Sequence, residues 1–276
     1  MVTRIVLIIT LTAALSACGS GSASSGKNRV VASFYPLAYA AERIGGARVA
    51  VDNLTPAGAE PHDLELTAKA VGRIESAATV LFLGHGFQPA VSDAVDQAAG
   101  DAVDVLSGLP LHRSDPHVWL DPILFAHVAE RIGRALHASP APLVRDLRRL
   151  DGEYRHGLAL CARKDIVTSH AAFGYLARRY GLRQVAITGL TPEAEPAPRQ
   201  LSKVVRLVER THATTVFFET LVSPRLADTV AREVGAKTAV LDPIEGLTRD
   251  EQDRRDDYFT VMRRNLAALR KALACR

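Results

Sequence analysis

The sequence predicts an α/β protein made of two parallel-sheet lobes joined by a long linking helix. The chain has 276 residues, 47% of them hydrophobic, which is enough for two modest domains. In each half, short β-rich runs alternate with amphipathic stretches of helical period, a pattern typical of parallel sheets covered by helices. No segment of roughly 20 to 50 residues repeats, so the sequence disfavours a solenoid.

The N-terminus predicts export. Arg4 precedes the apolar run IVLIITLTAAL, which has the length of a secretory signal and is too short for a membrane span. The LSAC that ends at Cys18 resembles the bacterial lipoprotein box, so we expect residues 1–17 to be a signal peptide and Cys18 to carry a lipid. Residues 18–28 would form a flexible Gly/Ser tether. An ordinary signal peptide with a chance cysteine is the alternative. The lipidated form would be extracytoplasmic, anchored to the outer face of the bacterial cell membrane.

Residues 29–139 are expected to form the N-terminal α/β lobe. Runs rich in β-branched and apolar residues predict four strands, at 30–34, 49–54, 79–84 and 102–106. Apolar residues at helical spacing predict the helices between them, at 36–45, 67–77 and 87–99.

A helical stretch from 122 to 163 follows, and prolines divide it at SPAP, residues 139–142. Proline is tolerated where a helix starts but not in its interior, so the linking helix is expected within 140–163. The segment from 141 to 162 would be ~33 Å long, enough to run along both lobes.

Residues 164–276 repeat the alternation and are expected to form the C-terminal α/β lobe. The predicted strands are 165–170, 183–188, 214–219 and 237–242. The predicted helices are 171–180, 197–211, 222–234 and 250–273. Ligands of open α/β sheets bind at the carboxyl ends of the strands, so two facing lobes would surround one cleft.

Charge and cysteine content narrow the possible classes. The formal charge of +4 is weak, and no basic run is interleaved with aromatic residues, so nucleic acid is not an expected partner. With Cys18 assigned to the lipid, Cys161 and Cys275 remain in an oxidising compartment, where they can form a disulfide. Two unpaired thiols are the alternative.

Four side chains that can bind a metal lie at or after the carboxyl ends of predicted strands. They are His62, His117, His170 and Asp242, each more than 50 residues from the next. Three imidazoles and a carboxylate suit a borderline divalent metal, zinc above all. Taken alone, each residue could instead have a purely structural role; Asp242, for example, precedes a proline and could stabilise a turn. Their coincidence at strand ends supports a site that only a fold joining distant loops can make.

Six sequence phrases together resemble those of a known family. They are PAGAEPHDLELT, DPHVWLDP, VTSHAAFGYLARRYGL, TPEAEPAPRQL, VFFET and LDPIEGL, in this order over about residues 30–273. The set is similar to that of the zinc and manganese substrate-binding proteins of bacterial ABC importers, the cluster A-I or ZnuA/TroA-like family.

The resemblance implies a fold and a function. It implies two α/β lobes, a divalent metal in the cleft between them, and a monomeric importer component that delivers metal to ABC permease membrane subunits and is not an enzyme. It also implies that the metal ligands are His62, His117, His170 and Asp242. The two Asp-Pro pairs of DPHVWLDP would fix the backbone so that His117 points into the cleft, with Trp119 as packing.

The metal and the rest of the site have open alternatives. In the family, a histidine at the position of His170 indicates zinc and a carboxylate indicates manganese, so zinc is favoured, with manganese or iron as alternatives. Water instead of Asp242 can complete the coordination. Glu195 or Glu219 is expected to accept the outer N–H of a liganding imidazole. A zinc hydrolase with Glu60 as base, or an adhesin without tight metal binding, represents a different class.

The remaining histidines are expected outside the ligand set. Many zinc members of the family carry a long His-rich loop before the second ligand, whereas the segment here is SGLPLHRSD, with His112 as its single imidazole. His85 is considered for the mouth of the cleft, and His127 is expected to pack inside a helix.

Overall fold

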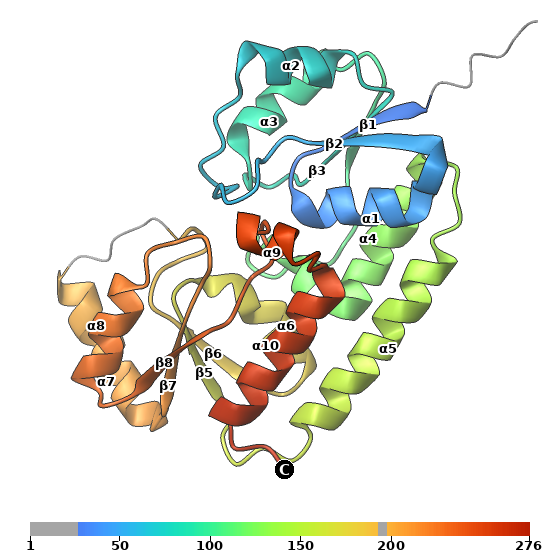
Figure 1. Ribbon diagram of the computed structural model, residues 1–276. Helices are drawn as coiled ribbons and strands as arrows, with labels where there is room; N and C mark the ends of the chain where they lie inside the picture. The colour runs from blue at the N-terminus through green and yellow to red at the C-terminus, as the bar shows by residue number, and fades with distance from the viewer. Residues whose placement is uncertain (1–26, 193–197) are drawn as a thin grey trace, which may run out of the picture.

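The computed structural model describes residues 27–192 and 198–276, which form two α/β halves beside a group of long helices (Figure 1). The expected signal peptide, the lipidation site Cys18 and nearly all of the tether lie outside these residues. No helix in the described part of the chain is long and apolar enough to cross a membrane. The fold class predicted from the sequence is confirmed, and the lobe boundaries remain predictions.

The first half contains a four-stranded parallel sheet in the order β2-β1-β3-β4. Val30 and Leu81 face one side of it, in a core shared with α1 and α4, and Val31 and Val80 face the other side, under α2 and α3. Both faces of the central strands β1 and β3 are buried, which explains why these two strands are rich in consecutive apolar residues. The elements are β1 (Asn28–Ala32), α1 (Tyr35–Gly45), η1 (Gly46–Arg48), β2 (Val49–Asn53), α2 (Ala68–Glu75), β3 (Thr79–Phe82), α3 (Pro89–Ala94), η2 (Val95–Gln97) and β4 (Asp101–Asp104).

The second half repeats this topology with the order β6-β5-β7-β8, again all parallel. Val167 and Val216 pack with residues of α7 and α8, whereas Ile166 and Phe217 face the core shared with α6 and α10. The elements are β5 (Asp165–Thr168), η4 (Ala171–Phe173), α6 (Gly174–Arg179), β6 (Arg183–Ala186), α7 (Pro198–Thr211), β7 (Thr215–Phe218), α8 (Arg225–Glu233), β8 (Lys237–Val240), α9 (Arg249–Asp253) and α10 (Tyr258–Ala272).

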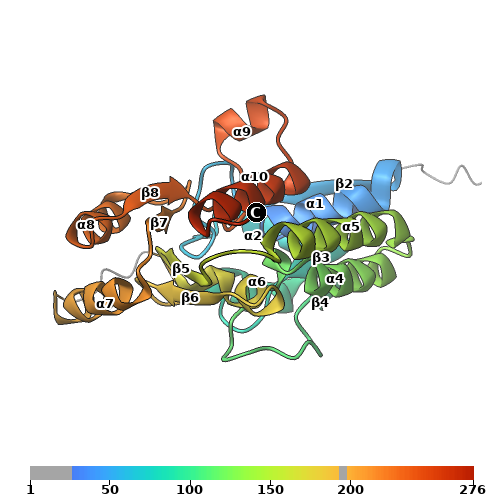
Figure 2. The ribbon, with the colours of Figure 1, turned by 90° about the horizontal axis from the view of Figure 1, so that it is seen from below.

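Three elements connect the halves: η3 (Val118–Leu120), α4 (Pro122–Ala135) and α5 (Ala141–Leu158). The 18 residues of α5 give a helix of about 27 Å that runs past both halves (Figures 1 and 2). One apolar core crosses between the halves and contains Phe34, Tyr154 and Phe217. Since a large apolar interface resists sliding, the halves are held in one arrangement.

The structure differs from the sequence prediction at the ends of elements. The strands end one or two residues before their predicted carboxyl ends. Residues such as Leu83 and Leu241 lie beyond the strands but remain buried, so the apolar pattern continues past the ladder. The predicted helix 250–273 is two helices, because Arg255 adopts a left-handed φ of 58° and the Asp257 side chain caps α10 by accepting from the Thr260 N–H at 2.8 Å.

Cys161 and Cys275 are joined by a disulfide that ties the segment after α5 to the C-terminus. The cross-link closes 114 residues of chain, so it removes much of the freedom of the unfolded state.

We predict that reducing this disulfide lowers the free energy of unfolding by up to about 5 kcal/mol, from the entropy of closing so long a loop. Guanidinium unfolding with and without dithiothreitol measures the change. The Cys161→Ser/Cys275→Ser variant should resemble the reduced protein and be insensitive to dithiothreitol. Equal stability of oxidised and reduced wild type would show that the cross-link contributes nothing.

Candidate metal centre

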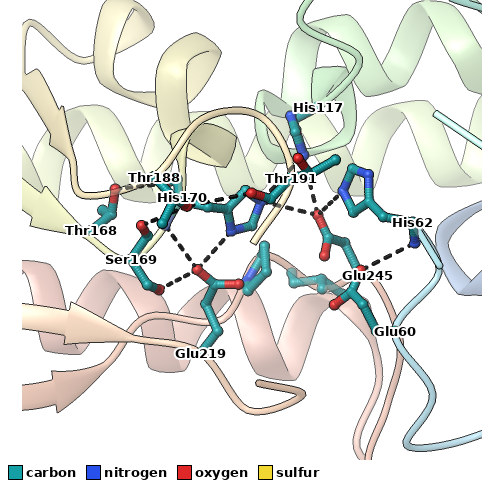
Figure 3. A network of polar contacts seen from close by, with 12 residues as sticks. Glu60, His62, His117, Thr168, Ser169, His170, Thr188, Thr191, Glu219 and Glu245 are labelled. Carbon is teal, nitrogen blue, oxygen red and sulfur yellow. Dashed lines mark hydrogen bonds and ion pairs between the residues drawn. The ribbon is translucent and has the colours of Figure 1, made fainter. Parts of the chain in front are cut away.

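Four buried side chains from four separate loops converge between the two halves (Figure 3). His62 lies in the loop after β2 and His117 in the segment between β4 and η3, whereas His170 follows β5 and Glu245 follows β8. Each offers one ligand atom, and these atoms lie within 4.8 Å of one another. Each half therefore contributes two groups of the kind that bind metal ions in proteins.

The carboxylate of Glu245 is central to the group. Its Oε1 lies 3.1 Å from Nε2 of His117 and 3.4 Å from Nε2 of both His62 and His170. The side chains of these residues are at most 4% exposed. A buried negative charge needs a compensating partner, and here the partners are imidazoles that can carry protons or a metal.

Two of the imidazoles are oriented by carboxylates behind them. Asp115 accepts from the His117 backbone N–H at 3.0 Å, and its Oδ1 lies 2.7 Å from Nδ1 of the same residue. Glu219 Oε1 lies 2.6 Å from Nδ1 of His170 and also accepts a bond from the Ser169 hydroxyl (Figure 3). A carboxylate on Nδ1 leaves Nε2 free to bind a metal. This is the role expected of Glu219, whereas Glu195 lies outside the described residues.

His62 is held differently. Its backbone N–H donates to Glu60 at 3.1 Å, and its ring packs edge-on against Phe87 with the ring centres 4.5 Å apart. Within residues 27–192 and 198–276, no carboxylate hydrogen-bonds its Nδ1. His62 is therefore placed by packing and by its backbone.

The fourth position differs from the sequence prediction. Glu245 joins the three histidines, whereas the carboxylate of Asp242 shapes the loop: it accepts from the Ile244 N–H at 2.7 Å and from the Thr220 hydroxyl at 2.9 Å. Asn265 holds the Asp242 backbone on both sides, with bonds of 2.9 and 2.7 Å. Asp242 stabilises the turn that carries Glu245.

The segment DPHVWLDP does more than frame His117. Asp121 caps α4, accepting from the N–H of Ile123 at 2.9 Å. The Trp119 indole donates to the Pro243 carbonyl at 2.7 Å. Trp119 therefore ties the segment of His117 to the loop of Glu245, in addition to the packing expected of it.

The other histidines stay outside the group. His85 is exposed in the turn after β3, at a φ of 60°. His127 was expected to pack inside a helix, but its side chain is 54% exposed beside Glu130. His112 is exposed.

Charge compensation shifts the pKa values of the group. Burial lowers the pKa of His170, but Glu245 and Glu219 outweigh it and raise the pKa to about 10. Burial raises the pKa of Glu245, but His170 and His117 hold it well below its usual range. In the metal-free protein Glu245 is thus ionised and His170 protonated at neutral pH. Because the His170 pKa is raised, its stabilisation is complete below pH 6.5 and is lost as the pH rises through about 10.

We predict that Zn²⁺, which this donor set favours, displaces at least about one proton on binding at pH 7, because a liganding imidazole must be neutral. Affinity should keep rising with pH toward the His170 pKa of about 10, well past the ordinary histidine value of 6.5. Calorimetric titrations in buffers of different ionisation enthalpy count the protons. Glu219→Gln should lower the count, since it removes one charge that raises the His170 pKa. Binding without proton release would contradict the charge balance described here.

Comparisons with known proteins agree with this site. Residues 30–272 match the family described as ZnuA, zinc-uptake complex component A, periplasmic. The zinc-binding lipoprotein AdcA of Streptococcus pneumoniae is 34% identical over 290 residues, covering 93% of this chain and 58% of AdcA, so the chain spans less than two thirds of that relative. The high-affinity zinc uptake system protein ZnuA of Bacillus subtilis is 32% identical over 298 residues, covering 94% of this chain and 93% of that protein.

A solved structure shares the fold. The crystal structure of the Zn(II)-bound ZnuA-like domain of Streptococcus pneumoniae AdcA matches with a TM-score of 0.76 and 34% identity, over 90% of this chain and 99% of that domain. The chain belongs to the ZnuA family.

Proposed function

We propose that this chain is an extracytoplasmic solute-binding protein that captures one Zn²⁺ ion between its two halves and delivers it to an ABC permease. One observation carries the proposal: three imidazoles and a carboxylate, all buried, gather in one group across the interface of the halves. The names of the zinc-binding relatives support the same cargo.

The donor set favours zinc over manganese. Imidazole nitrogen suits zinc, whereas manganese prefers carboxylate, carbonyl and water oxygens. His62, His117 and His170 supply three nitrogens and Glu245 one oxygen, in the number that tetrahedral zinc takes.

Transport fits this site better than hydrolysis. Catalytic zinc keeps one open position for water or substrate, but here Glu245 fills the fourth position of the group. Glu60, the candidate base of a hydrolase, accepts the His62 N–H with Oε1 and thereby helps to hold the loop of a metal-site histidine. Burial and repulsion from Glu245 raise the pKa of Glu60 to about 8.

Capture and delivery also set requirements outside the site. Export and a lipid on Cys18 would keep the protein at the membrane beside its permease. The shared core limits movement of the halves and includes Ile244 and Leu247 of the loop after β8. Release would therefore rely on the loop after β2, which meets the loop after β8 where the Gly58 N–H donates to the Leu247 carbonyl at 3.0 Å. The loop after β2 carries His62, whose ring is held by packing against Phe87, with no carboxylate of the described residues on its Nδ1.

We predict that two isosteric changes in the loop after β8 differ strongly in their effect on zinc affinity. Glu245→Gln removes the ligand charge and should weaken zinc binding by more than about 100-fold, since even partners behind a ligand are worth about 10- to 100-fold. Asp242→Asn keeps the turn and should change affinity by less than about 10-fold. Competitive titration against a zinc chelator measures both, and His170→Ala serves as the positive control.

The ranking of the two variants decides the fourth ligand. A large loss in Asp242→Asn with little loss in Glu245→Gln would restore Asp242 as the ligand. Wild-type binding that is micromolar or weaker would remove the support for an importer.

A further inference from the structure

A cavity of about 560 Å³ lies beside the metal centre and is lined by Asp115 and by Ala171, the residue after His170. The segment between β4 and η3 forms one wall with His112, Arg113 and Asp115, and the second half forms the other with Gly174, Arg178 and Gln184. Figure 2 shows this segment looping out beside α6 and β6. The volume is in the range of pockets that bind small organic molecules.

The walls of the cavity combine cations with apolar surface. The guanidinium groups of Arg113 and Arg178 are exposed, and among the described residues neither forms an ion pair. Arg178 lies over the Tyr175 ring, with 5.3 Å to its centre. Ala177 and Leu182, both buried, add apolar surface. Guanidinium groups recognise carboxylates through paired N–H bonds, so this cavity suits an organic anion.

Asp115 adds a free acceptor. Its Oδ1 is used by His117, whereas its Oδ2 has no hydrogen-bond partner within the described residues. Oδ2 faces the cavity at Gly174, where an added Cβ would lie 2.9 Å from it. A carboxylate with an unused oxygen favours a ligand that brings its own hydrogen-bond donor.

The backbone of this wall is held in an unusual shape. Arg113 and Ser114 both adopt left-handed conformations, with φ of 52° and 61°. Tyr175 fixes them from the other half: its hydroxyl accepts from the His112 N–H and donates to the Asp115 carbonyl, both at 2.9 Å. Two successive non-glycine residues in this region cost free energy, and such strain is concentrated at functional sites.

We propose that this cavity binds a small carboxylate that also carries a hydrogen-bond donor, of the amino-acid or hydroxy-acid class. Arg113 and Arg178 pair with the carboxylate, and the donor of the ligand binds Oδ2 of Asp115. The apolar part of the ligand packs against Leu182. This site is separate from the metal site and does not depend on the proposed transport of zinc.

Occupation of the cavity is coupled to the metal centre. Asp115 orients His117, and Ala171, which lines the cavity, directly follows His170. A ligand that holds Asp115 in place favours the arrangement that binds metal, and the coupling is reciprocal. Zinc and the carboxylate should therefore each raise the affinity of the other, by about 5-fold or more.

Four probes of similar shape test the chemistry of the cavity. The full chain is titrated calorimetrically with L-leucine, 2-hydroxyisocaproate, isocaproate, which lacks the donor, and isoamylamine, which lacks the carboxylate. We expect the first two to bind at least about tenfold more tightly than the last two, the loss typical of one missing polar contact. Repeating the L-leucine titration on zinc-loaded protein measures the coupling, and equal affinities there would refute it.

Substitutions of the cavity arginines test whether L-leucine binds in this cavity. Arg178→Gln and Arg113→Asn, in which asparagine tolerates the left-handed φ, should each weaken L-leucine binding by about tenfold or more. Both should bind zinc as the wild type does when leucine is absent. Arg148→Gln, an exposed arginine on α5, is the matched control and should change neither affinity. If zinc-competent protein binds none of the four probes, or if L-leucine binds all three variants equally, the proposal is wrong, and the zinc titrations judge the transport function separately.

Discussion

One carboxylate oxygen, Oε1 of Glu245, lies 3.1 to 3.4 Å from three imidazole nitrogens inside the protein. The rest of the site follows from neutralising this buried charge. Without metal, the proton on His170 does so, which is why the pKa of His170 rises to about 10 while that of Glu245 falls. A divalent cation replaces that proton and satisfies all four groups at once. The four groups therefore have the charges and the placement that a divalent cation requires.

The fold supplies this arrangement by repeating one topology. Each half is a four-stranded parallel sheet of the same strand order, and the four groups lie in segments that follow β2, β4, β5 and β8. The shared core fixes the halves so that their strand ends face each other. Asp115 and Glu219 then aim two rings, whereas His62 is held by packing against Phe87. The loop of His62 is thus the part of the site with the fewest polar constraints on its ring.

The sequence predicts the fold and three of the four groups, because apolar runs mark the strands and ligands lie just beyond them. It does not distinguish Asp242 from Glu245 in LDPIEGL, since the choice depends on a turn with Ile244 at a φ of 57°. In that turn the carboxylate of Asp242 accepts a hydrogen bond from the Ile244 N–H, and the side chain of Glu245 points toward the three histidines. Asp257 signals the break before α10 as a helix cap, and residues 249–257, RDEQDRRDD, contain no apolar residue, so the single helix predicted over 250–273 overlooked a break that the sequence marks.

Diffraction from crystals of the zinc-loaded protein, with anomalous data collected at the zinc edge, tests the central claim most directly. We expect one anomalous peak between the halves, with Nε2 of the three histidines and an oxygen of Glu245 about 2.0 to 2.2 Å away. Zinc bound to Asp242 with Glu245 turned aside, or a peak elsewhere in the molecule, would contradict the account.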